Sequence, residues 1–221
     1  MGKRVYKFTS AKYGVSSLES RRLKLSTIDE LNDPFDLASL DTTEPHIERA
    51  LDELVIHFRQ NYGLLCFSRN WDNLLLWSHY GSSHTGVCLG FDIPDDVNDD
   101  AMGTDVLYQP NVLQIRRPED VNHDLASRLL RTKHESWSYE QEVRLFVRLN
   151  DPPDDEGLRW VQFGPELQVK EVIAGSQCAR ADLEKLAEVV KGFAGVEHSW
   201  AYMKKDAFLL VRHHFPPPWF S

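Results

Sequence analysis

The sequence predicts an α+β fold with a mixed, mostly antiparallel sheet flanked by helices. Short apolar or alternating segments typical of strands recur from residue 4 to residue 212. Longer segments, such as residues 44–61, carry apolar residues at helical spacing. The two kinds of segment do not alternate in the regular rhythm of a parallel sheet, so antiparallel pairing is favoured.

Strands are expected, in chain order, over residues 4–8, 22–25, 64–68, 86–93, 105–108, 142–149, 167–174 and 207–212. The segment 86–93, G-V-C-L-G-F-D-I, is the clearest of them. Apolar positions that recur at period two, or in short runs, predict the interior of the sheet. This interior consists of Leu64, Cys66, Val87, Leu89, Phe91, Val143, Leu145, Val147, Val172 and Leu209.

Helices are expected over residues 16–20, 44–61, 73–80, 117–133 and 180–193. In the second of these, Pro45 suits the first turn, and Ile47, Leu51 and Phe58 share one face. Pro118 and the acidic residues after it suit the first turn of the helix 117–133.

Composition indicates one globular domain spanning residues 1–221. The formal net charge is −9, from 25 basic and 34 acidic residues, which argues against broad nonspecific nucleic-acid binding. The three cysteines are widely spaced, which argues against a disulfide framework or a zinc site. No apolar stretch approaches the roughly 18 residues of a membrane span, and no signal peptide is evident. A cytoplasmic location is expected.

The segment L-N-D-P-F-D, residues 31–36, predicts a fixed turn because Pro34 restricts the chain and Asx side chains bond their own backbone. On local evidence Phe35 is the buried anchor of this turn. The alternative is a rigid loop that presents Asn32 or Asp33 to a ligand.

The segment 66–81 brings Cys66 and His79 close in sequence, which raises the hypothesis of a cysteine nucleophile. The apolar strand around Cys66 argues against it, because thiols in such strands are usually inert core residues. His79 and His84, with a weak third candidate in His134, are too few for a catalytic metal, and no metal site is expected.

The segment K-H-E-S-W-S-Y-E-Q-E-V-R, residues 133–144, contains two acids two residues apart. If Glu140 and Glu142 both lie on the strand, they share one face, with Arg144 continuing the row. One interpretation is a solvated face on which Arg144 pairs with both acids. The other is a pocket walled by Trp137 and Tyr139, which suits a sugar or a nucleotide.

These segments occur in an order that resembles a known family. Y-K-F, L-N-D-P-F-D, C-F-S, N-L-L-L-W-S-H-Y-G, G-V-C-L-G-F-D, the lone strand residue Tyr108, and K-x-x-x-W-x-Y-E-x-E-x-R follow one another over residues 6–144. Together they resemble the uncharacterised bacterial domain-of-unknown-function family 2971. The layout resembles, more distantly, the ADP-ribosyltransferase superfamily, whose split sheet clamps NAD. One departure is that the first strand carries Lys7 where that superfamily has His or Arg.

The distant resemblance implies an NAD-dependent ADP-ribosyltransferase-like enzyme, such as a bacterial toxin or a phage-defence effector, with an unknown acceptor macromolecule. The implied catalytic residues are Glu142, Glu140 and His79. The residues implied to hold NAD are Lys7, Ser26, Asn32, Phe35, Trp77, Tyr80 and Tyr108. Within this set, Lys7 (or Arg22) would pair with the pyrophosphate, and Glu142 would be the more important carboxylate. We expect both acids, His79, Tyr80 and the Lys7 strand to line one cleft.

Two other functions fit the same residues. One is a nucleic-acid-processing enzyme or nuclease that uses Glu140, Glu142, Asp33 and His79 with Mg²⁺. The other is a non-catalytic module that binds a nucleotide or another small ligand.

Overall fold

The computed structural model describes residues 2–36, 40–41, 44–94, 101–115, 117, 121 and 123–214. It confirms the α+β class, with mostly antiparallel sheets and helices. The chain divides into two compact units. The first unit comprises Met1–Lys24, Phe67–Asp95 and Trp160–Ser221, and the second comprises Leu25–Cys66 and Asp96–Arg159. The single domain expected from composition stays a prediction.

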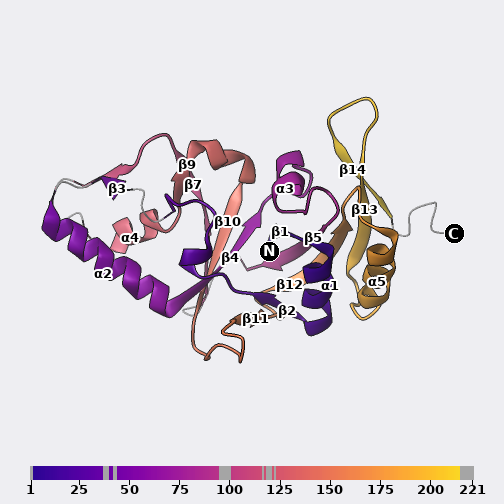
Figure 1. Cartoon of the computed structure of the whole chain (residues 1–221), viewed down its shortest axis with the longest axis horizontal. Helices are drawn as coiled ribbons and strands as arrows, with labels where there is room; N and C mark the ends of the chain where they lie inside the picture. The colour runs from indigo at the N-terminus through magenta and orange to yellow at the C-terminus, as the bar shows by residue number, and fades with distance from the viewer. Residues whose placement is uncertain are drawn as a thin grey trace. The chain divides into compact units, whose positions relative to one another are not determined.

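The first unit is built on a sheet with the strand order β14-β13-β12-β5-β1 (Figure 1). Its strands are β1 (Lys3–Thr9), β5 (Val87–Ile93), β12 (Gln168–Ala174), β13 (Glu197–Met203) and β14 (Leu210–His214). β12 and β13 run parallel, and the other neighbours in this order are antiparallel. The end of β4 (Tyr62–Ser68) also pairs with β1, at Ser68 opposite Tyr6. A two-stranded ribbon of β2 (Arg22–Lys24) and β11 (Trp160–Gln162) completes the strands of this unit.

Helices α1 (Ala11–Ser20) and α5 (Arg180–Val190) lie side by side on the first unit's sheet (Figure 1). A methyl group on Gly14 of α1 would overlap Val87 of β5, so this glycine allows the helix to approach the strand closely. Helix α3 (Leu74–His79) packs on the other face, where Trp77 meets Phe8 edge-on with ring centres 5.1 Å apart. The first helix begins at residue 11, five residues before the expected start, with Ser10 as its N-cap.

The second unit contains three strands in the order β4-β10-β6, with β10 at Glu142–Arg148 and β6 at Ala101–Asp105. The unit also contains two small parallel pairs of strands. They are β3 (Leu40–Asp41) with β8 (Leu113–Gln114), and β7 (Leu107–Gln109) with β9 (Thr132–His134).

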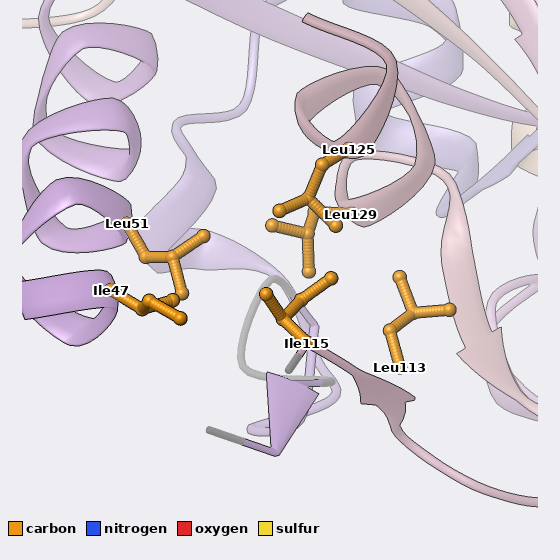
Figure 2. Packing of buried hydrophobic residues seen from close by; sticks show 6 residues of the cluster. All are labelled: Ile47, Leu51, Leu113, Ile115, Leu125 and Leu129. Atoms are coloured by element: carbon orange, nitrogen blue, oxygen red, sulfur yellow. The ribbon is translucent and has the colours of Figure 1, made fainter. Parts of the chain in front are cut away.

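The helices of the second unit are α2 (Pro45–Asn61) and α4 (His123–Leu129), with 3₁₀ turns η1 (Ile28–Glu30) and η3 (Glu135–Glu140). Leucines and isoleucines of α2, α4 and the β8 segment form a buried cluster (Figure 2). Its members are Ile47, Leu51, Leu113, Ile115, Leu125 and Leu129.

Most of the predicted interior is confirmed, because seven of the ten residues are buried: Leu64, Val87, Leu89, Phe91, Val143, Leu145 and Val172. Cys66 and Val147 are half-buried. The prediction that Leu209 is buried is wrong, since this residue is 54% exposed. The buried residue is its neighbour Leu210, with which β14 begins. Successive strand residues point to opposite faces, so an error of one residue exchanges inside for outside.

The helix expected over residues 117–133 is confirmed at His123–Leu129 and wrong after Leu129. The chain leaves α4 at Leu129, and Thr132–His134 form strand β9. Residues 118–120 and 122 lie outside the described part of the chain. Strand β13 was not expected, because only Trp200 and Ala201 of its seven residues are buried, which gives a weak alternation.

All three cysteines, Cys66, Cys88 and Cys178, are free thiols, and Cys88 is fully buried. Burial raises the pKa of the Cys88 thiol well above its ordinary value, so this sulfur stays protonated and unreactive. Within the described residues, no helix has the length and apolar character needed to cross a bilayer.

We expect Gly14→Ala to lower the free energy of unfolding by about 1–3 kcal/mol, as overpacking does. In an unobstructed helix interior the same change would stabilise by about 0.5–1 kcal/mol. Here the added methyl collides with the buried side chain of Val87. Denaturant unfolding measures the difference. Gly164→Ala is the control, because a methyl there meets no atom within 4 Å; stabilisation by Gly14→Ala would contradict the close approach of α1 to β5.

Candidate functional site

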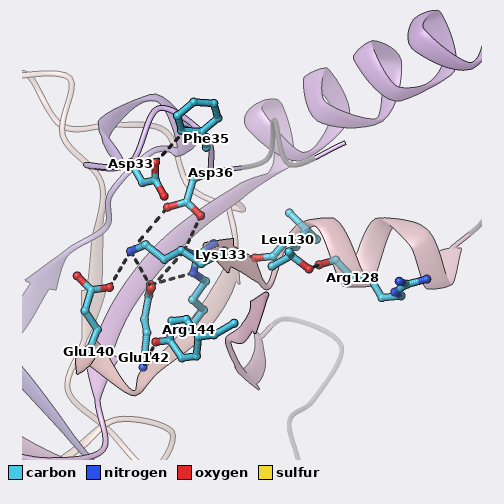
Figure 3. A network of polar contacts seen from close by, with 11 residues as sticks. Asp33, Phe35, Asp36, Arg128, Leu130, Lys133, Glu140, Glu142 and Arg144 are labelled. Atoms are coloured by element: carbon cyan, nitrogen blue, oxygen red, sulfur yellow. Dashed lines mark hydrogen bonds and ion pairs between the residues drawn. The ribbon is translucent and has the colours of Figure 1, made fainter. Parts of the chain in front are cut away.

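A buried ion-pair network in the second unit is centred on Arg144 of β10 (Figure 3). This side chain is fully buried, yet each of its three nitrogens has an acceptor. Nε donates to Glu142 Oε1 at 2.8 Å, Nη1 to the carbonyl oxygen of Leu130 at 2.9 Å, and Nη2 to Asp36 Oδ1 at 2.8 Å. Arg144 and Glu142 meet because residues two apart on a strand share a face.

Lys133, on β9, supplies the second buried cation. Its Nζ donates to Glu140 Oε2 at 2.7 Å and to Glu142 Oε2 at 3.2 Å, and lies 3.9 Å from Asp36 Oδ2. The same nitrogen lies 4.7 Å from the centre of the Trp137 ring, a cation–π contact. Burial lowers the pKa of Lys133, but the carboxylates of Glu142 and Glu140 outweigh it, so the pKa is raised and the amine stays charged.

The two acids meet through a turn and not along a strand, which corrects the expectation from the sequence. Glu140 ends the 3₁₀ turn η3, and Gln141 has a left-handed backbone with φ at 42° before β10 begins at Glu142. Both carboxylates still reach Lys133 Nζ. Lys133 therefore binds both acids, whereas Arg144 pairs with Glu142 and Asp36.

Glu142 is ionised at neutral pH. Burial raises the pKa of a carboxyl group, but Arg144, Lys133 and a hydrogen bond from the Cys66 thiol outweigh that effect and lower the pKa of Glu142 to about 2. Its backbone N–H donates to the hydroxyl oxygen of Tyr108 at 2.8 Å. Burial raises the pKa of Tyr108 to about 12, so its hydroxyl stays neutral and fixes the start of β10.

The loop that ends at residue 36 supplies the third carboxylate of the network, that of Asp36, which pairs with Arg144. Asp33 Oδ1 accepts from the backbone N–H of Phe35 at 3.0 Å, and Asp36 N–H donates to the Asp33 carbonyl oxygen, also at 3.0 Å. The fixed turn is present, but its anchor is not the expected one. Phe35 is 64% exposed, whereas the carboxylate of Asp36 is 2% exposed and pairs with Arg144.

The sequence assigned no role to two residues of this site, Lys133 and Asp36. The only local signal for Asp36 was its place as the second acid of L-N-D-P-F-D, two residues after Pro34. Its Oδ2 has no hydrogen-bond donor within the described structure. Burial raises the pKa of Asp36, and Arg144 opposes that rise. Three carboxylates thus share two cations, and Oδ2 of Asp36 remains as a buried acceptor that receives no hydrogen bond.

The ten residues named from the sequence divide between the two units. Lys7, Trp77, His79 and Tyr80 lie in the first unit, and Ser26, Asn32, Phe35, Tyr108, Glu140 and Glu142 lie in the second. The single cleft expected to hold both groups stays a prediction.

For three of these residues, the contacts or the exposure of the side chain bear on the expected role. Trp77 is fully buried between Phe8 and His84, which removes it as a stacking surface for a ligand. Ser26 pairs through its backbone with Leu64. His79 is exposed. Within the described residues no three His, Cys, Asp or Glu side chains are grouped as metal ligands.

Comparison with known families matches part of the chain. Residues 76–145 match the model of a family described as Protein of unknown function (DUF2971). The matched segment includes α3 from Leu76 onward, β5, Lys133, both glutamates and Arg144. Neither the curated proteins nor the solved structures gave a match.

We expect Arg144→Met to cost about 3–5 kcal/mol of unfolding free energy, because it leaves the carboxylates of Glu142 and Asp36 buried without their main partner. Arg180→Met is the matched control. It removes an Arg–Glu pair of similar distance, 3.0 Å to Glu184, from an exposed helix surface and should change stability by less than about 0.5 kcal/mol. Equal effects in urea unfolding would refute the importance of the network.

Glu142→Gln should change how stability depends on pH. The folded pKa of about 2 lies below the ordinary value of 4.5, so ionised Glu142 stabilises the fold fully above that value. This contribution is lost as the pH falls from 4.5 towards 2, because the unfolded chain takes up the proton first. The stability difference between parent and variant should therefore be largest near neutral pH and shrink below pH 4.5.

Urea unfolding of both proteins at a series of pH values measures this difference. Glu188→Gln, at an exposed pair with Lys191, is the control and should follow the parent throughout. A difference between parent and Glu142→Gln that is independent of pH would show that the charge of Glu142 does not stabilise the fold.

Proposed function

We propose that the protein is a binding module for a small ligand with a flat ring, of the nucleotide type, and that Phe35 stacks on that ring. The observation that carries the proposal is a phenylalanine that is 64% exposed on a loop locked by buried acids. A ring that is 64% exposed gains much less from burial than a core phenylalanine does. Because its loop is fixed, little conformational entropy is lost when a ligand stacks on it.

A second aromatic segment is tied to the same network. Trp137 and Tyr139 lie in η3, are half-buried, and have ring centres 6.2 Å apart. Lys133 contacts the Trp137 ring, and Glu140 at the end of η3 binds Lys133. The buried charges therefore fix two segments that present aromatic rings. Aromatic surfaces beside carboxylates suit a ribose-linked base, whose hydroxyls need acceptors.

Glycosyl transfer from NAD is the second proposal, favoured by one observation. Glu142 is ionised, as required of a carboxylate that stabilises an oxocarbenium-like transition state. Arg144 and Lys133 offset that charge, and the carboxylate is almost completely buried. The binding function therefore has more support than the transfer. The resemblance of the sequence to the ADP-ribosyltransferases is the reason to test NAD as the ligand. We also infer a cytoplasmic location.

The binding proposal predicts that Phe35→Ala weakens binding with little effect on stability. Stacking of a base on an aromatic side chain contributes about 1–3 kcal/mol. Calorimetric titrations of the whole chain with NAD, adenosine and nicotinamide should show a loss of that size for at least one probe. The melting temperature should hardly change, because the ring is exposed. Phe208→Ala is the control, since Phe208 is 95% exposed in the other unit.

Equal affinities of Phe35→Ala and Phe208→Ala for every probe would exclude Phe35 as the stacking residue. Chromatography of samples taken over time from a mixture of the protein and NAD distinguishes glycosyl transfer from ligand binding. Nicotinamide release that is lost in Glu142→Gln supports transfer, and saturable binding without release supports the binding module.

A further inference from the structure

A second cluster of polar side chains, in the first unit, lies on the face of the sheet that α3 also contacts. Tyr6 of β1, Gly90 of β5 and Glu171 of β12 are opposite one another on three adjacent strands. A Cβ at Gly90 would lie 2.8 Å from the Cβ of Glu171 and 3.2 Å from a ring carbon of Tyr6. Because position 90 has no side chain, the Tyr6 hydroxyl reaches Glu171 Oε2, at 3.5 Å.

Two arginines converge on Glu171, one on each carboxylate oxygen. Arg4 Nη1 donates to Oε1, and Arg212 Nη1 donates to Oε2. Arg4 Nε also donates to Asp92 Oδ1 at 2.5 Å. The guanidinium of Arg212 lies over the Trp71 ring, 4.3 Å from its centre. Each arginine is thus fixed at two points, which sets the orientation of its planar fork.

The buried and exposed parts of this cluster differ in chemistry. The side chain of Glu171 is 9% exposed and both its oxygens are engaged, whereas Arg4 and Arg212 are 35% and 30% exposed. The contacts with Glu171, with Asp92 for Arg4 and with the Tyr6 hydroxyl for Arg212 use only part of the five N–H groups of each guanidinium. Guanidinium nitrogens only donate hydrogen bonds. The cluster therefore offers solvent a set of fixed donors, and a complementary group must be an acceptor.

We propose that Arg4 and Arg212 form a binding site for a phosphate or diphosphate group. Two guanidinium forks can donate to several oxygens of a tetrahedral phosphate, whereas a carboxylate offers only two oxygens in one plane. The contacts with Glu171, Asp92 and Trp71 hold the forks before the anion arrives, which reduces the entropic cost of binding. This site lies in the first unit and does not depend on the role of Phe35.

Calorimetric titration of the whole chain with inorganic phosphate, pyrophosphate and acetate, at constant ionic strength, tests the proposal. The parent should bind pyrophosphate saturably and more tightly than acetate. Arg212→Lys keeps the charge but removes the fork, and should weaken pyrophosphate binding about tenfold or more. Arg21→Lys is the matched control, because Arg21 lies in the same unit and also over an aromatic ring, 4.4 Å from the centre of Phe193, but its Nη2 donates to the carbonyl oxygen of Gly192 and not to a carboxylate.

Asp92→Asn gives a result that a purely structural role of the cluster would not produce. Asparagine retains the oxygen that accepts from Arg4 and removes one negative charge beside the site, so pyrophosphate binding should tighten. The melting temperatures of all variants are recorded alongside. The proposal is overturned if the parent does not bind pyrophosphate, if acetate binds equally well, if Arg212→Lys binds like the parent, or if Asp92→Asn weakens binding. Adenosine, which has no phosphate, separates this outcome from a failure at Phe35.

Discussion

The complete burial of Arg144 is the constraint on which the second unit depends most. A guanidinium removed from water is tolerated only when its charge is paired and its N–H groups have acceptors. Those acceptors come from Glu142 two residues earlier on β10, from the chain just after α4, and from the loop before α2. Any shift of one of these segments leaves a buried charge without a partner. Arg144 therefore fixes the relative positions of three parts of the unit that are distant in sequence.

This constraint explains why the residues of the loop 31–36 have the reverse of their expected exposure. Burying a phenylalanine side chain is worth about 1.5–3 kcal/mol. Leaving Arg144 without the carboxylate of Asp36 costs about 3–5 kcal/mol, because one partner of a buried pair is lost. Since Asp36 and Phe35 are neighbours, the turn orients one of them inward, and the larger free energy selects the acid. Local sequence cannot show this, because Arg144 lies 108 residues away.

What the sequence predicts well depends on short-range pattern. Alternating apolar and polar residues, or short apolar runs, were enough to predict the strands β1, β4, β5, β10 and β12. Apolar residues at helical spacing were enough to predict α2. The proximity of Glu140, Glu142 and Arg144 also follows from short separations, although Gln141 brings it about with a left-handed turn. The meeting of Tyr6, Gly90 and Glu171 depends on the register between strands far apart in the chain. No local pattern records that register, so the Arg4 and Arg212 cluster was not expected.

A carboxylate that is ionised is not thereby available to a ligand. Glu142 has a low pKa because Arg144, Lys133 and Cys66 already stabilise its negative charge. The same contacts that keep it ionised occupy its oxygens, so a developing positive charge on a substrate would compete with two buried cations. In this network Oδ2 of Asp36 is a fully buried oxygen without a hydrogen-bond donor among the described residues. The charge of Glu142 and the unsatisfied oxygen of Asp36 therefore reside on different carboxylates, and both carboxylates are buried, so the folded unit uses Glu142 first as the partner of Arg144 and Lys133.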